Sequence, residues 1–184
     1  MDLTFKKIGI FGIQGSGKTI LARKLIRTFR KPIVYEVNPD FRQDNCMIYK
    51  PKDLTLATLD NFCAKVKQLA LKKKCDCFII DEFDMFCQGQ MSLPTNLNDL
   101  VMNHRHYGLA MIFISRRLQD IPAKIVESCH HLFVFKIEGF NALQRLKSVH
   151  PDFEQAMSLL DYNKHNFVHK ELGNSPVVTK AVSL

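Results

Sequence analysis

The chain has 184 residues, 46% of them hydrophobic, and it carries a formal net charge of +8 with a sequence pI near 9.2. Its length and ordinary apolar fraction predict one domain with a real core, and the lack of an apolar run long enough to cross a membrane excludes a transmembrane helix. The charge favours an acidic partner, of which nucleic acid is the commonest, although a soluble basic surface would show the same excess.

The six cysteines indicate a reducing compartment. They form no CxxC pair, and several lie in apolar runs, where cysteine acts as a small hydrophobe. The run Cys129-His130-His131 is not expected to bind zinc, because neighbouring residues of a strand point to opposite faces and no second pair stands at ligand spacing. With no signal peptide in the sequence, we expect a cytoplasmic protein.

Apolar runs alternate with helical patterns along the chain, which is typical of an α/β fold with a largely parallel sheet. In chain order we expect a strand over 7–12, a helix over 18–29, a strand over 32–37, a helix over 53–71, a strand over 75–81, a helix over 95–108 and strands over 109–115 and 131–137. We expect a single domain over 1–184, with a core at about 5–137. A C-terminal helix and an edge hairpin should follow at about 139–184, with the last few residues disordered.

The first strand and helix flank the segment GIQGSGKT, which matches the GxxxxGKT motif through Gly12, Gly17, Lys18 and Thr19. Glycines let backbone N–H groups surround phosphates, and the helix N-terminus adds a favourable dipole. Lys18 is expected to reach the β- and γ-phosphates, and the Thr19 hydroxyl to ligate Mg²⁺. The segment therefore predicts binding of ATP with Mg²⁺. Its other expected nucleotide contacts are Gln14, Gly15 and Ser16.

The apolar strand CFIID ends at Asp81, and Glu82 follows it. Asp81 would lie beside the phosphate loop and hold Mg²⁺ through water, while Glu82 would polarise an attacking water. This pair favours hydrolysis over transfer to a small substrate; the alternative is that both residues cap a strand at the surface. Asp84 is expected at the surface or as a helix cap.

The strand over 32–37 and a long helix separate the two motifs in the chain. We therefore expect one strand to be inserted in the sheet between the phosphate-loop strand and the acidic strand. By analogy of fold, that order is typical of RecA-like P-loop NTPases with a catalytic glutamate, whereas small-molecule kinases usually lack it.

Three further segments complete a family pattern: VNPDF at 37–41, HRHYG at 104–108 and ISRRLQDIPAKIVESCHHLFVF at 114–135. With the two nucleotide motifs, they make the chain resemble the HerA–FtsK superfamily of DNA-pumping ATPases over 5 to about 137. It is most similar to the small genome-packaging ATPases of double-jelly-roll viruses. The resemblance implies a ring oligomer, a hexamer, that moves double-stranded DNA into a preformed capsid in the host cytoplasm and meets capsid or portal-vertex proteins.

The resemblance also implies roles for single residues. Arg105 matches an arginine that lies just before the fourth strand and reaches the neighbouring subunit's nucleotide. The alternative for Arg105 is a cation that interacts with the dipole at a helix C-terminus.

The fourth strand ends with Ser115, Arg116 and Arg117, where the family often has Ser-Gln-Arg with a glutamine that senses the γ-phosphate. Ser115 and Arg117 fit this pattern, as a nucleotide contact and a catalytic residue. Arg116 replaces the glutamine, so either it contacts the γ-phosphate itself or the sensor is lost. Asn38 or Asp40, in the turn after the second strand, would approach the nucleotide.

Three other interpretations remain open. A filamentous-phage assembly ATPase of the zonula-occludens-toxin type normally carries a membrane span after its ATPase domain, and none is found here. A small kinase should show an arginine-rich lid and a substrate-binding acid after the third strand. A nucleotide-gated binding module would not need all of the catalytic residues. For DNA contact, charge alone suggests Lys50, Lys52 and Lys72 to Lys74.

Overall fold

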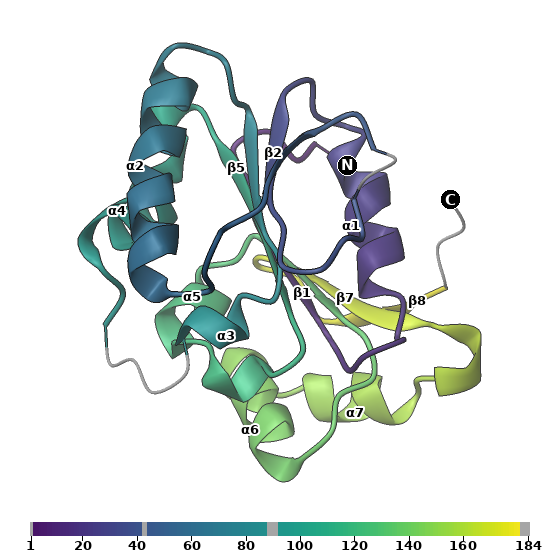
Figure 1. Cartoon of the computed structure of the whole chain (residues 1–184). Coiled ribbons are helices and arrows are strands. Elements are labelled where there is room, and N and C mark those ends of the chain that lie inside the picture. The colour runs from purple at the N-terminus through teal and green to yellow at the C-terminus, as the bar shows by residue number, and fades with distance from the viewer. Residues whose placement is uncertain (1, 42–43, 88–91, 181–184) are drawn as a thin grey trace.

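The computed structural model describes residues 2–41, 44–87 and 92–180 (Figure 1). They form an eight-stranded sheet in the order β3-β2-β4-β5-β1-β6-β7-β8. The strands are β1 (Lys7–Phe11), β2 (Pro32–Tyr35), β3 (Met47–Tyr49), β4 (Cys77–Ile80), β5 (Ala110–Ser115), β6 (His131–Val134), β7 (Phe167–Glu171) and β8 (Val177–Thr179). Strands β1 to β6 pair in parallel, whereas β7 pairs antiparallel with β6 and β8. The expected mostly parallel α/β fold is confirmed.

Helices cover both faces of the sheet, with α1 on one face and α2 with α4 on the other (Figure 1). The α-helices are α1 (Lys18–Ile26), α2 (Leu56–Leu71), α3 (Asp84–Cys87), α4 (Thr95–Asn103), α5 (Ala123–Glu127), α6 (Phe140–Val149) and α7 (Phe153–Ser158). Short 3₁₀ helices are η1 (His104–Tyr107), η2 (Leu118–Asp120) and η3 (Tyr162–Lys164). The sheet is thus the middle layer of three.

Alternate residues of the central strand β5 supply two separate hydrophobic cores. Met111 and Phe113 belong to the larger cluster with α2 and α4, whereas Ile112 and Ile114 belong to a second cluster with α1. This is the two-residue period of a strand. Because both faces are covered, the strand is apolar at every position before Ser115, as expected for a buried parallel strand.

One strand is inserted between the phosphate-loop strand and the acidic strand, as expected, and that strand is β5. It comes after both motifs in the chain. Strand β2, which separates the motifs in the sequence, lies on the far side of β4 and pairs there with the short edge strand β3. Strand β3 was not predicted, because three residues without full burial give little pattern to detect.

Two helices end earlier than the sequence indicates. Helix α1 ends at Ile26 rather than at residue 29, and the Thr28 hydroxyl donates to the Leu25 carbonyl just beyond it. Helix α4 ends at Asn103, and η1 follows it to Tyr107, where Gly108 with a φ of 69° is a left-handed termination.

The C-terminal part forms α6 and α7 and then a hairpin of β7 and β8 at the edge of the sheet. Because β7 runs antiparallel to β6, its amino end lies at the same edge as the carboxyl end of β6. Residues 181–184, expected to be disordered, lie outside the described residues. No helix among residues 2–41, 44–87 and 92–180 is long and apolar enough to cross a membrane.

Candidate nucleotide-binding site

The segment GIQGSGKT forms the turn between β1 and α1, at the carboxyl edge of the sheet. A Cβ at Gly12 would lie 2.7 Å from the Phe135 Cβ, and Gly17, the residue before α1, has a φ of 105° in the left-handed region. Only glycine meets both demands without strain. The Ile13 N–H donates to the Lys136 carbonyl at 2.8 Å, which fixes the loop against the end of β6.

The side chains of the loop offer one cation and two hydroxyls to a ligand. Lys18 is only 7% exposed; burial lowers the pKa of its ammonium, an effect that the nearby Glu82 carboxylate opposes. Its Nζ donates to the Ile13 carbonyl at 2.8 Å. The Ser16 hydroxyl is buried and has no hydrogen-bond partner in the described part of the chain. With Thr19 as the second residue of α1, this geometry suits phosphate oxygens.

Asp81 follows β4 and lies at the same edge, two strands away from the loop. It is 3% exposed, and its carboxylate accepts the Asn38 backbone N–H at 3.2 Å. Burial raises the pKa of Asp81 to about 6. The Asp81 carboxylate and the Thr19 hydroxyl, both at the carboxyl edge of the sheet, are the oxygen ligands that Mg²⁺ prefers, so these residues fit the ion.

Glu82 adopts a φ of 47°, an uncommon conformation for a residue with a side chain. Its Oε1 accepts from Asn38 Nδ2 at 3.1 Å and from Arg116 Nε at 2.8 Å, and Arg116 Nη2 lies 2.6 Å from the same oxygen. Arg116 Nη1 also donates to Gln14 Oε1 at 3.3 Å. The structure therefore brings the residue in the glutamine position against the candidate catalytic carboxylate and the phosphate loop.

Asp84 is not at the surface, one of the two positions expected for it, but it does stand at the start of a helix, as the first residue of α3. It is 6% exposed and accepts the Ser115 hydroxyl at 2.8 Å and the Arg116 backbone N–H at 3.3 Å. It thus links the start of α3 to the end of β5 and holds the backbone that carries Arg116. The acidic segment alone could not reveal this, because its partners lie about 30 residues further along the chain.

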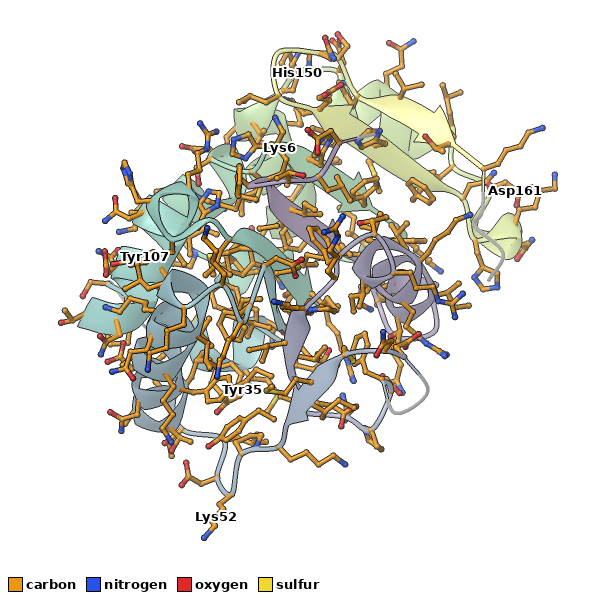
Figure 2. The ribbon with its side chains drawn as sticks, turned by 90° about the horizontal axis from the view of Figure 1, so that it is seen from above. Lys6, Tyr35, Lys52, Tyr107, His150 and Asp161 are labelled. Atoms are coloured by element: carbon orange, nitrogen blue, oxygen red, sulfur yellow. The ribbon has the colours of Figure 1, made fainter. Side chains whose placement is uncertain are left out.

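Two predicted catalytic arginines lie away from this cluster. Arg105 is exposed on η1, before β5, and contacts His130 Nε2, while the Lys7 backbone N–H donates to His130 Nδ1 at 3.0 Å. This is the amino edge of the sheet, seen from above in Figure 2, where Tyr107 of the same helix is labelled. Arg117 pairs with Asp120 at 3.0 Å. Neither arginine belongs to the cluster around Glu82.

Comparison with protein families finds a match over most of the chain. The profile of the ATPase family associated with various cellular activities (AAA) matches residues 8–137. A search of curated protein sequences finds no match.

Solved structures with this fold include viral packaging enzymes. The DNA-packaging ATPase B204 from Sulfolobus Turreted Icosahedral Virus aligns with a TM-score of 0.80 and 15% identity, over 99% of this chain and 100% of that one. The genome packaging NTPase B204 from Sulfolobus turreted icosahedral virus 2, in complex with ATP-gammaS, aligns with a TM-score of 0.79 and 14% identity, over 97% and 98%.

The N-terminal domain of zonular occludens toxin from Neisseria meningitidis aligns with a TM-score of 0.52 and 12% identity, over 71% of this chain and 76% of that one. At these identities the likenesses show the fold. The fold shared with B204 agrees with the resemblance that the sequence indicated.

Proposed function

Because the chain belongs to the ATPase family associated with various cellular activities, we propose that it is a Mg²⁺-dependent ATPase that drives double-stranded DNA into a viral capsid. The observation that carries hydrolysis is the carboxylate of Glu82, held beside the phosphate loop by Asn38 and Arg116. A positioned carboxylate at this point suits activation of a water better than transfer to a small acceptor.

Different residues have different roles in the proposed hydrolysis. Lys18 and the loop N–H groups bind the β- and γ-phosphates, and Thr19 and Asp81 would hold Mg²⁺, which when bound supplies positive charge to the phosphate oxygens. Among the described residues, every hydrogen bond to the Glu82 side chain uses Oε1. Its Oε2 can therefore accept the proton of the attacking water.

Arg105 supports sharing of each site between neighbouring subunits. It is exposed, lies at the sheet edge opposite the phosphate loop, and forms no ion pair in the part of the chain that the structure describes. A head-to-tail contact would bring this edge against the next subunit's nucleotide, and such contacts form a ring when the rotation between subunits closes. We take the ring to be a hexamer, in which Arg105 stabilises charge on the transferring phosphoryl group.

The polymer that the ring moves is inferred from charge and from fold. A net charge of +8 suits the phosphate backbone of double-stranded DNA, held without sequence readout. The fold is shared over nearly the whole length of both chains with B204, described as a DNA-packaging ATPase. Capsid or portal-vertex proteins would be the docking partners, in the cytoplasm of the host cell.

The test measures ATP hydrolysis with and without double-stranded DNA. Glu82→Gln should retain ATP and lower turnover about 100-fold or more, because the general base is lost. Arg105→Ala should lower turnover about 1,000-fold, whereas Arg145→Ala, the same change on α6, should not.

Mixing the two inactive variants distinguishes an active site shared between two subunits from one that is complete within a single subunit. Some junctions then combine an intact Glu82 from one subunit with an intact Arg105 from the next, so part of the activity should return. Failure of the mixture to recover activity would contradict a finger that acts between subunits. No hydrolysis by the unmodified protein under any condition would overturn the motor.

The likeness to the zonular occludens toxin domain favours one second candidate, an ATPase that assembles or extrudes a filamentous phage. The two proposals differ in the effect of DNA. A packaging motor should hydrolyse ATP faster when double-stranded DNA is added, and an ATPase that DNA leaves unaffected would favour the second candidate.

A further inference from the structure

The C-terminal segment that leads into β7 lies against the phosphate loop. Because β7 is antiparallel to β6, residues 163–166 reach the carboxyl edge of the sheet, the edge that carries the loop. Figure 1 shows this green-to-yellow stretch after α7 on the same lower side of the molecule as the start of α1. A hollow of about 150 Å³ lies between the two segments. Its lining residues are Ile13, Gln14, Gly15, Ser16, Lys136, Asn163, His165 and Asn166.

The order of strands decides which end of a nucleotide would meet this hollow. The acidic pair follows β4 and Arg116 follows β5, on one side of β1, whereas β6 and β7 lie on its other side. The γ-phosphate must point toward Glu82 for hydrolysis, so the α-phosphate and the nucleoside must point toward β6 and β7. The hollow lies in that direction.

The size of the hollow suits one end of a ligand. Pockets that enclose a whole ligand are about 300–1,000 Å³, whereas this one holds about 150 Å³. The phosphates would lie over the loop, outside it, and only the nucleoside would enter.

The lining can recognise a base. His165 has a φ of 51°, and its Cβ lies 3.8 Å from the point that a Cβ on Gly17 would occupy, so its exposed side chain begins beside the start of α1. Asn163 and Asn166 contribute amides, each with a donor and an acceptor. An amide matches the donor and acceptor edge of adenine, whereas the two acceptors of guanine suit arginine or lysine.

We propose that this hollow binds the adenine end of ATP, with the base stacked on the His165 ring and its edge hydrogen-bonded by Asn163 and Asn166. The proposal rests on the ATPase function proposed above. It assigns recognition of the base to a C-terminal segment that lies outside residues 8–137, the part of the chain that the family profile matches.

The experiment compares ligands with and without a base. Isothermal titration calorimetry in Mg²⁺ would measure the Kd of ATP, GTP and inorganic tripolyphosphate for the full chain. His165→Asn removes the ring but keeps a residue that tolerates a positive φ. Its affinity for ATP should fall about tenfold, the size of a base–aromatic contact, with no change for tripolyphosphate.

Asn163→Ala should reduce the preference for ATP over GTP, which the unmodified protein is expected to show. Lys136 also lines the hollow, so equal binding of ATP and GTP by the unmodified protein would overturn recognition of adenine. The matched controls are His106→Asn, at the opposite sheet edge, and Asn141→Ala on α6; neither should alter any of the three affinities.

The results distinguish failure of the base site from failure of the proposed ATPase function. Equal loss of ATP and tripolyphosphate binding in His165→Asn, or no loss of either, would overturn the base site alone. Absence of binding of both ligands to the unmodified protein would overturn the proposed function and this inference with it.

Discussion

At the scale of single residues, Arg116 connects the parts of the site. Its guanidinium touches Glu82 through two nitrogens and Gln14 through the third, and its backbone N–H is held by Asp84. Two charged donors on one oxygen, Oε1, hold the carboxylate more firmly than a single donor does. Arg116 therefore acts as a positioning residue for Glu82, in addition to any contact with the γ-phosphate.

Kinetics can distinguish an Arg116 that positions Glu82 from an Arg116 that contacts the γ-phosphate. Arg116→Met should lower kcat at least tenfold, because Glu82 then keeps only the Asn38 amide as a described partner, while the Kd of ATP changes little. Arg116→Gln, which still donates, should recover part of the loss. Steady-state kinetics and ATP titrations check both, with Arg145→Met as control. Weaker ATP binding at unchanged kcat would show that Arg116 contacts the phosphate instead.

At the scale of elements, the sequence indicated the parts that depend on local pattern. The phosphate loop with its glycines and the strand that leads to Asp81 are each recognised from a pattern of consecutive residues, so both could be predicted. The bond from Arg116 to Gln14 joins residues 102 positions apart, and the burial of Asp84 depends on the end of β5. Such contacts depend on which strands become neighbours in the sheet, and a local sequence pattern does not predict the order of the strands.

The position of η1 likewise depends on contacts that no local pattern predicts. It contacts the starts of β1 and β6 through His130. The His130 ring accepts the Lys7 N–H and contacts Arg105, and burial together with that guanidinium lowers the pKa of His130 to about 4. A histidine whose pKa is lower in the folded than in the unfolded state stabilises the fold above its unfolded pKa of about 6.5. That contribution is lost as the pH falls toward 4.

The free energy of unfolding should therefore fall between pH 6.5 and 4, by up to about 1.4 kcal/mol per pH unit for this one group. In His130→Asn the amide oxygen can still accept the Lys7 N–H, but no proton is taken up, so the fall should be smaller. Urea unfolding followed by circular dichroism across this range is the measurement. His150→Asn, a change at a partly exposed histidine before α7, is the control. Parallel curves for the unmodified protein and His130→Asn would contradict the assignment.

At the scale of the whole molecule, the two edges of the sheet carry different halves of the proposed motor. The carboxyl edge holds the phosphate loop and the acidic pair, and the amino edge holds Arg105. Exposed lysines before β4, Lys72 to Lys74, add to the charge of the amino edge. If a ring joins the carboxyl edge of one subunit to the amino edge of the next, these lysines lie near each junction. There they can contact the phosphates of DNA as it moves from one subunit to the next.

DNA binding should then depend steeply on salt and not on sequence. Each lysine that contacts a phosphate adds about one to the slope of log K against log salt, so Lys72→Gln with Lys74→Gln should reduce that slope by about two. The matched control is Lys147→Gln with Lys164→Gln, which removes the same charge from lysines that are already paired with Glu154 and Asp161. Fluorescence anisotropy with two unrelated duplexes, from 50 to 200 mM salt, measures the slopes. Equal slopes for the two double variants would exclude this edge from the DNA path, because charge alone would then explain the binding.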